Sequence, residues 1–487
     1  MMAARSGYAL LGVLGVLSVA AVALQPVPWT QVWGGLAIVW LSAIPAALYL
    51  FGRNRAPMPF LPAVGLYYLV FYGLPIFLTP FAYLKGAHVV LYERIVLSDL
   101  DWRVMGLFAV SLALMFSAFY LSRSVLLARL PRFKLAAPAP YLLNILYWIL
   151  IASSLAYRWI PQLQAIPSIG QFVTPAGYVG LGGLFLQWHA GRLPAWQSYF
   201  AVLVVVPLDI YLRVRYLFMT DLLFLGMFVV FVLWRCQRVR LLAGIGLAGL
   251  MIVPLYSATS HFRGGGETLG EKIQASYEGA LDVLSGRETR NGVADGHGRI
   301  VKDGINIGPI SFDLRISPLV NRIGHIWVLQ TVIERTPEPV PYWDGYTYRP
   351  LLTSLIPRTL FPGKPEERMG GEFGVRYGFT EDEANRTSFN IPWTVELYAN
   401  FGVLGLLVGM TLFGILLGAL DKVFNSPESS DLEFLIGLTI VFRLVYQESN
   451  FSVMVGALPL LFVALYLYFA LGSKLGPRLA ALEGRQP

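Results

Sequence analysis

Long apolar segments alternate with short polar connectors along almost the whole chain, and this pattern constrains the fold more than any other feature. Each segment has roughly 17–24 residues, the length that a helix needs to cross the hydrocarbon core of a bilayer. Because no water reaches that core, the backbone must satisfy its own hydrogen bonds there, which favours helices. The composition agrees, with 56% hydrophobic and only 14% charged residues. We therefore predict an all-α polytopic membrane protein.

About twelve transmembrane helices are predicted, with one long hydrophilic loop before the last three. The segments are 7–24, 31–51, 60–78, 104–127, 141–156, 172–188, 196–212, 216–234, 241–256, 394–420, 432–446 and 451–471. Residues 1–257 thus hold nine helices, residues 258–392 form the loop, and residues 393–487 hold three helices and a tail. The first segment is expected to be a signal-anchor helix. The alternative is a cleaved signal peptide, because Ala21 and Ala23 have the spacing of a cleavage site.

Lysine and arginine residues gather in alternate connectors, and this bias predicts the orientation. The residues are Arg53, Arg55, Arg123, Arg129, Arg132, Lys134, Arg192, Arg235, Arg238, Arg240, Lys422, Lys474, Arg478 and Arg485. With twelve helices, all of them fall on one side, which is the cytoplasmic side. Both termini are then cytoplasmic. The loop 258–392 is expected in the periplasm, with the protein in a bacterial inner membrane.

The loop is predicted to contain two helices, at residues 267–284 and 318–334, and Pro318 near the start of the second favours a helix N-terminus there. Residues 297–310 are rich in glycine and are expected to be irregular. Residues 337–364 are rich in Pro, Tyr and Trp and are expected to form an ordered surface without regular structure.

Several classes of function are disfavoured by what the sequence lacks. It has no phosphate-binding loop for ATP, no zinc-ligand spacing and no Gly-x-Ser-x-Gly nucleophile motif. We expect neither a metal nor another cofactor. The net charge of +8 comes largely from residues that flank apolar segments, so nucleic acid is not an expected partner. The single cysteine, Cys236, excludes intramolecular disulfides. No internal repeat is visible, which argues against transporters built from inverted repeats.

Arginines on the predicted outer side are the first candidates for a binding site. They are Arg213, Arg215, Arg263, Arg322, Arg349, Arg358 and Arg443. A guanidinium group is planar, always charged and suited to phosphate oxygens, so the cluster favours a lipid-linked phosphate or diphosphate. The alternative is that these arginines reach lipid headgroups or pair with carboxylates. Arg213 and Arg215 are expected in a very short outer connector, where topology alone does not explain two cations.

His325 and Glu396 are the candidate catalytic residues. Arg322 and His325 share one face of the predicted 318–334 helix, where His325 can act as a base or bind phosphate. The alternative is an interfacial histidine. Glu396 stands at the start of an apolar helix, where partial burial would raise its carboxyl pKa toward neutrality. The alternative is a carboxylate that favours the helix dipole. Glu448 is a weaker version of the same pattern.

Two sequence strings and the helix layout resemble a known family. The strings are IPRTLFPGKP from Ile356 and ELYANFGVLG from Glu396. With Tyr346-Thr347-Tyr348 and Arg215, they resemble the O-antigen and exopolysaccharide repeat-unit polymerases of the Wzy type. In that family the arginine before the eighth helix often stands beside Ser or Gly, whereas here Arg215 stands between Val214 and Tyr216.

The resemblance implies a C-type glycosyltransferase fold and a metal-independent reaction in the inner membrane. A nascent glycan on undecaprenyl diphosphate would be the donor, and the terminal hydroxyl of a lipid-linked repeat unit would be the acceptor. Arginines would stabilise the leaving diphosphate, and Trp343, Tyr346 and Tyr348 would bind sugars. Membrane lipids and a chain-length regulator protein are further candidate partners.

Two other functions stay open. An O-antigen ligase would transfer the glycan to lipid A core, and the pairing of Arg322 with His325 fits it. A lipid-linked oligosaccharide flippase or other transporter would place ionisable residues deep in helices, for which Asp209 and Asp221 qualify.

Two expectations are specific enough to test. Glu396→Gln should lose on the order of 10²-fold or more of polymer formation, and His325→Ala should lose less. Arg215, Arg322 and Arg358 should converge on one outward cavity.

Overall fold

The structure is a computed structural model. It describes residues 2–52, 55–78, 100–166, 168–215, 219–238, 241–242, 244, 270–271, 274, 277–278, 288–289, 292–294, 299–302, 305–309, 320, 322–356, 360–361, 363, 369–380 and 388–482.

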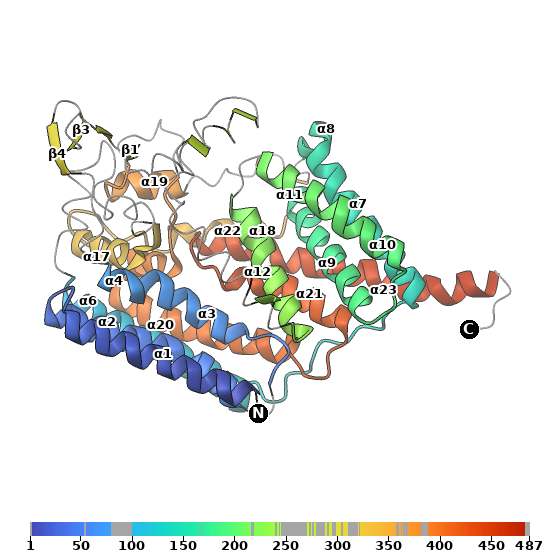
Figure 1. Ribbon diagram of the computed structural model, residues 1–487, viewed down its shortest axis with the longest axis horizontal. Coiled ribbons are helices and arrows are strands. Elements are labelled where there is room, and N and C mark those ends of the chain that lie inside the picture. The colour runs from blue at the N-terminus through green and yellow to red at the C-terminus, as the bar shows by residue number, and fades with distance from the viewer. Residues whose placement is uncertain are drawn as a thin grey trace.

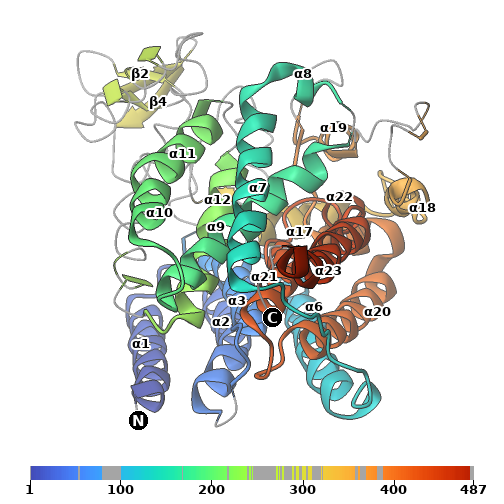
Figure 2. The same cartoon turned by 90° about the vertical axis from the view of Figure 1, so that its right-hand side faces the viewer.

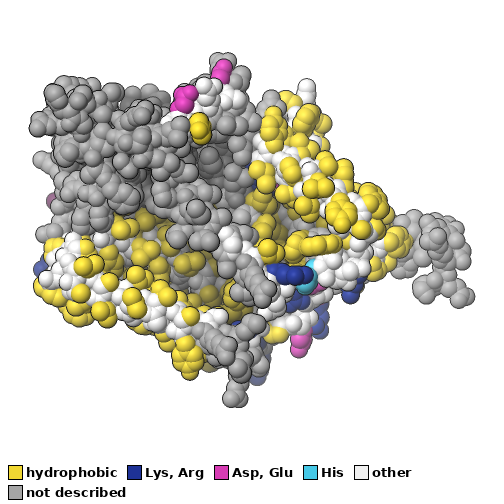
Figure 3. All heavy atoms as spheres, viewed as in Figure 1, with side chains coloured by type: hydrophobic (Ala, Val, Ile, Leu, Met, Phe, Trp, Pro, Cys, Tyr) yellow, Lys and Arg dark blue, Asp and Glu magenta, His cyan; other side chains and the backbone are white. Residues whose placement is uncertain are grey.

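Helices long and apolar enough to cross a membrane make up nearly half of the described chain. Eight stretches qualify: Ser6–Leu24, Trp29–Phe51, Phe60–Phe77, Trp102–Leu126, Pro140–Trp159, Ala195–Arg213, Trp393–Phe424 and Phe451–Leu475. A shorter apolar helix covers Leu223–Arg235. Most of the predicted segment 241–256 lies outside the described residues. Hydrophobic side chains cover much of the visible helical face in Figure 3, as expected for contact with lipid. The prediction of a helical multi-pass membrane protein is therefore confirmed.

A first group of helices comes from the N-terminal part of the chain and from one late helix. Its members are α1 (Met2–Leu24), α2 (Trp29–Phe51), α3 (Phe60–Tyr68), the π-helical turn η1 (Leu69–Gly73), α4 (Leu74–Phe77), α6 (Trp102–Leu121), the π-helical turn η4 (Ser122–Leu126) and α20 (Trp393–Phe424). Helix α2 packs against α1, α3 and α6, and α6 packs along α20 (Figure 1).

A second group packs around α9. Its members are α7 (Pro140–Trp159), α8 (Pro161–Gln164), α9 (Gly170–His189), α10 (Ala195–Phe200), the π-helical turn η5 (Ala201–Val205), α11 (Val206–Arg215), α12 (Met219–Arg235), α21 (Asp431–Val441), the 3-10 turn η8 (Phe442–Leu444), α22 (Phe451–Val455) and α23 (Leu458–Leu482). Helices α7 and α9 approach so closely that a side chain at Gly183 would collide with the ring of Tyr147. Helix α21 contacts both α9 and α20, so it joins the two groups.

The strands of the loop and its helix at Met369–Arg376 lie on the side of the helices opposite the N-terminus in both views (Figures 1 and 2). The described elements of the loop are β1 (Glu288–Thr289), β2 (Gly292–Ala294), β3 (Arg299–Lys302), β4 (Ile305–Pro309), α17 (His325–Arg335), the 3-10 turn η7 (Tyr346–Tyr348), α18 (Pro350–Ser354) and α19 (Met369–Arg376). The strands form one antiparallel sheet in the order β1-β2-β3-β4. Strands β3 and β4 occupy the stretch 297–310, so the expected irregular conformation was wrong there. Adjacent strands joined by a short turn satisfy their backbone hydrogen bonds with each other.

The structure agrees with one of the two helices predicted in the loop and changes the start of the other. In the stretch 267–284, the described residues, from Gly270 to Glu278, are all helical. The helix predicted at 318–334 begins instead at His325, because Gly324 has a ψ of 50°, outside the helical range. Val320, Arg322 and Ile323 are helical before this break, and Pro318 lies outside the described residues.

Helix α20 is broken near its N-terminal end. Gly402 has φ 63° and ψ −150°, a conformation that is essentially restricted to glycine. A side chain there would also lie 2.7 Å from the hydroxyl of Tyr342. The break separates a short helical piece that carries Glu396 and Asn400 from the long membrane-spanning piece.

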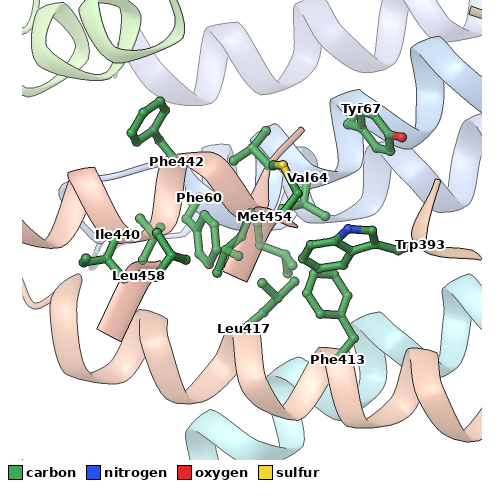
Figure 4. Packing of buried hydrophobic residues seen from close by; sticks show 14 of the residues in the cluster. Phe60, Val64, Tyr67, Trp393, Phe413, Leu417, Ile440, Phe442, Met454 and Leu458 are labelled. Atoms are coloured by element: carbon green, nitrogen blue, oxygen red, sulfur yellow. The ribbon is translucent and has the colours of Figure 1, made fainter. Parts of the chain in front are cut away.

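The core lies where α3, α20, α21, α22 and the start of α23 meet. Aromatic and aliphatic side chains from these helices interdigitate, with Phe60, Phe413 and Leu458 among them (Figure 4). Tyr67 and Trp393 lie at one end of this cluster in Figure 4. That end is where the described part of the loop contacts the helices.

Candidate functional site

A turn of buried polar residues between η8 and α22 forms the centre of the candidate site. Gln447 and Glu448 are each only 1% exposed, and Asn450 is also buried. The backbone N–H of Trp393 donates to the Gln447 carbonyl at 3.3 Å. Its indole N–H donates to the Ser449 carbonyl at 2.7 Å. These bonds hold the turn, residues 446–450, against the start of α20.

Three buried tyrosines from α3 and η1 line the same region. Tyr68 donates its hydroxyl hydrogen to Oε1 of Gln447. The hydroxyl of Tyr72 bonds that of Thr394 on α20. The hydroxyl of Tyr67 lies 3.2 Å from Nδ1 of His325 on α17. The wide turn η1 continues α3 at this point, and such π-helical turns are frequent at functional sites. Polar groups from the membrane helices and from the loop therefore meet here.

Arg322, His325 and Glu448 form the charged part of this cluster. The Arg322 guanidinium makes an ion pair with Glu448, and its Nη2 donates to the Tyr446 hydroxyl at 3.4 Å. Nε2 of His325 lies 3.8 Å from Oε1 of the same carboxylate, beyond hydrogen-bond distance. The side chain of Arg322 is 36% exposed, whereas that of Glu448 is 1% exposed. Arg322 thus connects a buried acid–base pair with the outside of the protein.

The environment of His325 favours the neutral imidazole. Burial lowers its pKa well below the ordinary 6.5, and the neighbouring Arg322 charge lowers it further. The Glu448 carboxylate near Nε2 favours the tautomer with hydrogen on Nε2. Nδ1 then accepts the hydrogen bond from Tyr67. Nδ1 is then the atom at which the neutral imidazole can take up a proton as a general base, by way of the Tyr67 hydroxyl.

Glu396 lies in the first turn of α20 and is fully buried, with 0% exposure. Its Oε2 accepts a hydrogen bond from the backbone N–H of Phe451 at 2.7 Å. The carboxylate therefore ties α20 to the residue that follows the 446–450 turn. No structural observation tests its expected role as a base, which stays a prediction.

The predicted sugar-binding aromatics lie on a loop segment that is fastened to α20. Gly345 donates its N–H to Oδ1 of Asn400 at 2.9 Å, and Nδ2 of Asn400 donates to Oγ1 of Thr347 at 2.9 Å. The backbone N–H of Trp343 donates to the carbonyl of Ala399 at 3.1 Å.

Within this segment the aromatic rings differ in exposure. The Trp343 ring is buried and lies 5.9 Å from that of Tyr346, which is 36% exposed. The Tyr348 ring stacks on Phe401 at 6.2 Å. Burial raises the pKa of Tyr348, and the charge of Glu396 adds to this effect. Tyr346 is thus the most accessible of the three for a sugar.

The arginines that were predicted on the outer side are only partly brought together. Arg322 belongs to the charged cluster, and Arg349 lies over the Tyr346 ring at 5.3 Å. Arg443 is half-buried and lies 5.9 Å from the centre of the Phe224 ring. Arg263 and Arg358 lie outside the described residues. Arg215 is the last residue of α11, and its side chain is also outside the described part. The predicted convergence of Arg215, Arg322 and Arg358 therefore stays a prediction.

Arg213 differs from the expectation of a short outer connector. It lies in helix α11 and is only 1% exposed. Its Nε donates to Oδ2 of Asp209 at 2.6 Å, one turn earlier on the helix, and its Nη1 donates to the Tyr178 hydroxyl at 2.9 Å. Arg158 on α7 binds the same Asp209 carboxylate at 3.0 Å. The connector prediction was wrong because this i,i+4 pair stabilises a continued helix.

An apolar pocket adjoins this second cluster. It has a volume of about 370 Å³ and lies between α9, α12 and the helical stretch from α10 to α11. Asp209 is the only charged residue in its lining, which includes Phe185, Phe228 and Leu233. The pocket is separate from the cluster around Glu448.

A metal site is not found in the described part of the chain. Among those residues, no group of three or more His, Cys, Asp or Glu side chains is placed to hold an ion. The expectation that the reaction needs no metal stays a prediction.

The comparisons with known proteins assign no activity. Residues 313–473 match the family model DUF8712, which is described as a domain of unknown function. No curated protein and no solved structure matches the chain. The matched region is about a third of the chain and includes Arg322, His325, Glu396 and Glu448. Three of the four come together at the 446–450 turn, and Glu396 binds the residue that follows it.

Proposed function

We propose that the protein polymerises lipid-linked oligosaccharide repeat units at the outer face of a bacterial inner membrane. One observation carries the proposal. A partly exposed Arg322 lies beside the neutral His325 and the buried Glu448, where the loop meets the membrane helices. This position suits a substrate whose lipid part lies in the bilayer and whose sugars lie in water.

The proposed reaction is a metal-independent glycosyl transfer. The terminal hydroxyl of a new repeat unit attacks the anomeric carbon of the nascent glycan on undecaprenyl diphosphate. A carbon–oxygen bond forms to the hydroxyl oxygen as the bond to the diphosphate oxygen breaks. The hydroxyl proton passes to a base of the protein, and the lipid diphosphate leaves with the electron pair. Positive charge near the leaving oxygens stabilises the transition state.

The geometry favours His325 over Glu396 as that base. His325 contacts Tyr67 and lies next to the partly exposed Arg322. Glu396 is fully buried and accepts a backbone hydrogen bond that holds the site together. In this assignment Arg322 binds the diphosphate, and Tyr346 with Arg349 faces the sugars.

The proposed topology has twelve helices with both termini in the cytoplasm and the loop in the periplasm, in a C-type glycosyltransferase-like arrangement. The alternation of Lys- and Arg-rich connectors supports it. A reporter fused after Pro487 should be active in the cytoplasm. Activity of that fusion in the periplasm would contradict the topology and place the loop on the wrong side.

The activity itself can be tested with reconstituted protein and lipid-linked repeat units. We expect His325→Gln to lose polymer formation while lipid-linked substrate still binds. His189→Gln is a matched control, since this exposed histidine lies 3.3 Å from Arg238, away from the loop. No polymer from the wild-type protein would exclude the proposal. Full activity of His325→Gln together with an inactive Glu396→Gln would restore Glu396 as the base.

A ligase is the first alternative, because Arg322 and His325 do lie together. A ligase would use the same donor but a different acceptor. Adding lipid A core to the assay distinguishes the two, since glycan on lipid A core without lengthening of the lipid-linked chain would favour the ligase.

A transporter is the second alternative, and the cluster of Arg158, Asp209 and Arg213 favours it. Charged groups buried within membrane helices are common on transport pathways. A vesicle assay that follows movement of lipid-linked oligosaccharide between leaflets tests this directly. Movement that stops in Arg158→Gln and continues in His325→Gln would support transport over polymerisation.

A further inference from the structure

The Glu448 carboxylate is placed between a cation and a base that compete for it. Arg322 holds it in an ion pair, while Nε2 of His325 lies 3.8 Å from the same oxygen, Oε1. Glu448 is 1% exposed and His325 is 4% exposed, so water screens neither of them well. The partner that Glu448 takes, Arg322 or His325, therefore strongly changes the electrostatic environment of the other group.

Arg322 is the member of this cluster that a ligand can reach. Its side chain is 36% exposed, and the buried Glu448 cannot follow it outward. A diphosphate carries more negative charge than a carboxylate and presents several oxygens to the guanidinium fork. An anion of this kind that arrives from the water-exposed side can replace Glu448 as the partner of Arg322.

We propose that Glu448 is a positioning residue that changes partner during the reaction. It holds Arg322 in the free protein and is released to His325 when a phosphate group of the substrate binds Arg322. The base then becomes stronger only in the presence of the diphosphate. This inference rests on the proposed function, because it assigns the diphosphate to Arg322.

The surroundings of His325 contain few other groups that could produce the same effect. From α3 and η1, Tyr67 and Tyr72 face its ring, and Tyr446 lies across Phe71 from it. The other elements packed against α17 carry the acidic residues Glu396 and Asp421 on α20, and Asp101 lies directly before α6. The backbone N–H of Asp101 donates to Oε1 of Gln330 on α17, and its carboxylate accepts from the N–H of Arg103 at the start of α6. Glu448 is the carboxylate in contact with His325 among the described residues.

Release of Glu448 has a measurable consequence at the imidazole. A cation that moves to another partner no longer opposes protonation of His325, and a nearby carboxylate favours it. We expect the apparent pKa of His325 to rise by about one unit or more when a diphosphate binds, as is typical for an opposite charge within about 4–6 Å.

The experiment is an NMR titration of His325 in detergent-solubilised full-length protein. The chain has five histidines, so replacing His88, His189, His261 and His297 by Gln leaves His325 as the only imidazole signal. If that variant does not fold, labelled wild-type protein is used and the signal is assigned by its loss in His325→Gln. The probes are farnesyl diphosphate, inorganic pyrophosphate and the uncharged alcohol farnesol, and binding of each is measured separately by equilibrium dialysis.

We expect both diphosphates, but not farnesol, to raise the pKa of His325. A response to farnesyl diphosphate alone would assign the site to lipid-linked diphosphates. In Glu448→Gln, diphosphate should no longer raise the pKa of His325. In Arg322→Gln, the pKa of His325 without ligand should already be higher than in the wild-type protein. A diphosphate that binds without moving the titration would overturn this inference and leave the proposed function intact, as would an unchanged pKa in Arg322→Gln. No binding of either diphosphate would overturn the proposed function and this inference together.

Discussion

Two buried arginine–carboxylate clusters in this protein have similar chemistry and different surroundings. Around Asp209, all members are buried: Arg158 is 5% exposed, Asp209 is 3% and Arg213 is 1%. Around Glu448, the arginine is partly exposed and a histidine takes the place of the second arginine. The Asp209 carboxylate accepts from two cations at 3.0 Å or less, whereas Glu448 pairs with one and is near a group that titrates.

The difference indicates separate roles. A carboxylate that is held by two buried guanidinium groups cannot exchange partners without leaving an unpaired charge in the protein interior, which costs several kcal/mol. The Asp209 cluster therefore stabilises the packing of α7, α9 and α11. The Glu448 cluster reaches water through Arg322, so its ion pair can be exchanged. The following predictions test this contrast, in order of decreasing effect.

Asp209→Asn should give the largest loss of stability. The change removes the carboxylate that Arg158 and Arg213 both contact, and breaking such a buried pair costs about 3–5 kcal/mol. Thermal unfolding in detergent measures it. The matched control is Glu428→Gln, which breaks an exposed pair with Arg132 and should cost less than about 1 kcal/mol. Equal losses in the two variants would show that the Asp209 cluster is not structural.

His325→Gln should affect activity and leave stability nearly unchanged. Loss of a general base lowers the rate by about 10²–10⁴-fold. We expect kcat to fall by about that factor, with KM for the lipid-linked repeat unit changed little. Reconstituted polymerisation assays provide both constants. If the variant unfolds like Asp209→Asn, the two clusters would be alike and the contrast between them would be lost.

Gly402→Ala should destabilise the region that carries Glu396 and Asn400. The backbone conformation with φ 63° is strained for alanine, at a cost of about 1–3 kcal/mol. The new methyl group would also meet the Tyr342 hydroxyl. Gly106→Ala on α6 is the control, since it meets nothing within 4 Å and alanine favours helix. A Gly402→Ala protein as stable as the Gly106→Ala control would refute the role of the break.

Acid should weaken the protein through His325. Its pKa in the folded state lies well below 6.5, so the unfolded chain takes up the proton first. The contribution of the neutral imidazole is complete above pH 6.5 and is lost as the pH falls below it, by up to about 1.4 kcal/mol per pH unit. Unfolding temperatures measured between about pH 7 and pH 5 should fall less in His325→Gln than in the wild type. His189→Gln should follow the wild type, and identical curves for all three would contradict the buried neutral histidine.

The sequence predicted the helical class and most helix positions, because membrane-length apolar segments are a local property. The loop before the last three segments and the position of Glu396 at a helix start could be predicted in the same way. The helix start at His325 could not, because Pro318 suggested an earlier start and the conformation of Gly324 depends on its surroundings. The pairing of Arg213 could not be predicted from the local sequence either. Its partner Tyr178 on α9 is 35 residues away. Arg158 on α7, which binds the same Asp209 carboxylate, is 51 residues from Asp209.

The tertiary structure decided which polar residues share a site. Tyr67, Tyr72 and Gln447 carry no pattern in the sequence beyond polar atoms in apolar segments. Tyr67 and His325 are 258 residues apart, and Tyr68 and Gln447 are 379 apart. A buried polar group must find a partner, but the sequence does not say which one, because the choice depends on how the helices pack. The sequence by itself therefore determined a helical membrane protein with a long polar loop before its last helices. Only the packing of α3, α17 and the 446–450 turn placed Glu448 between Arg322 and His325.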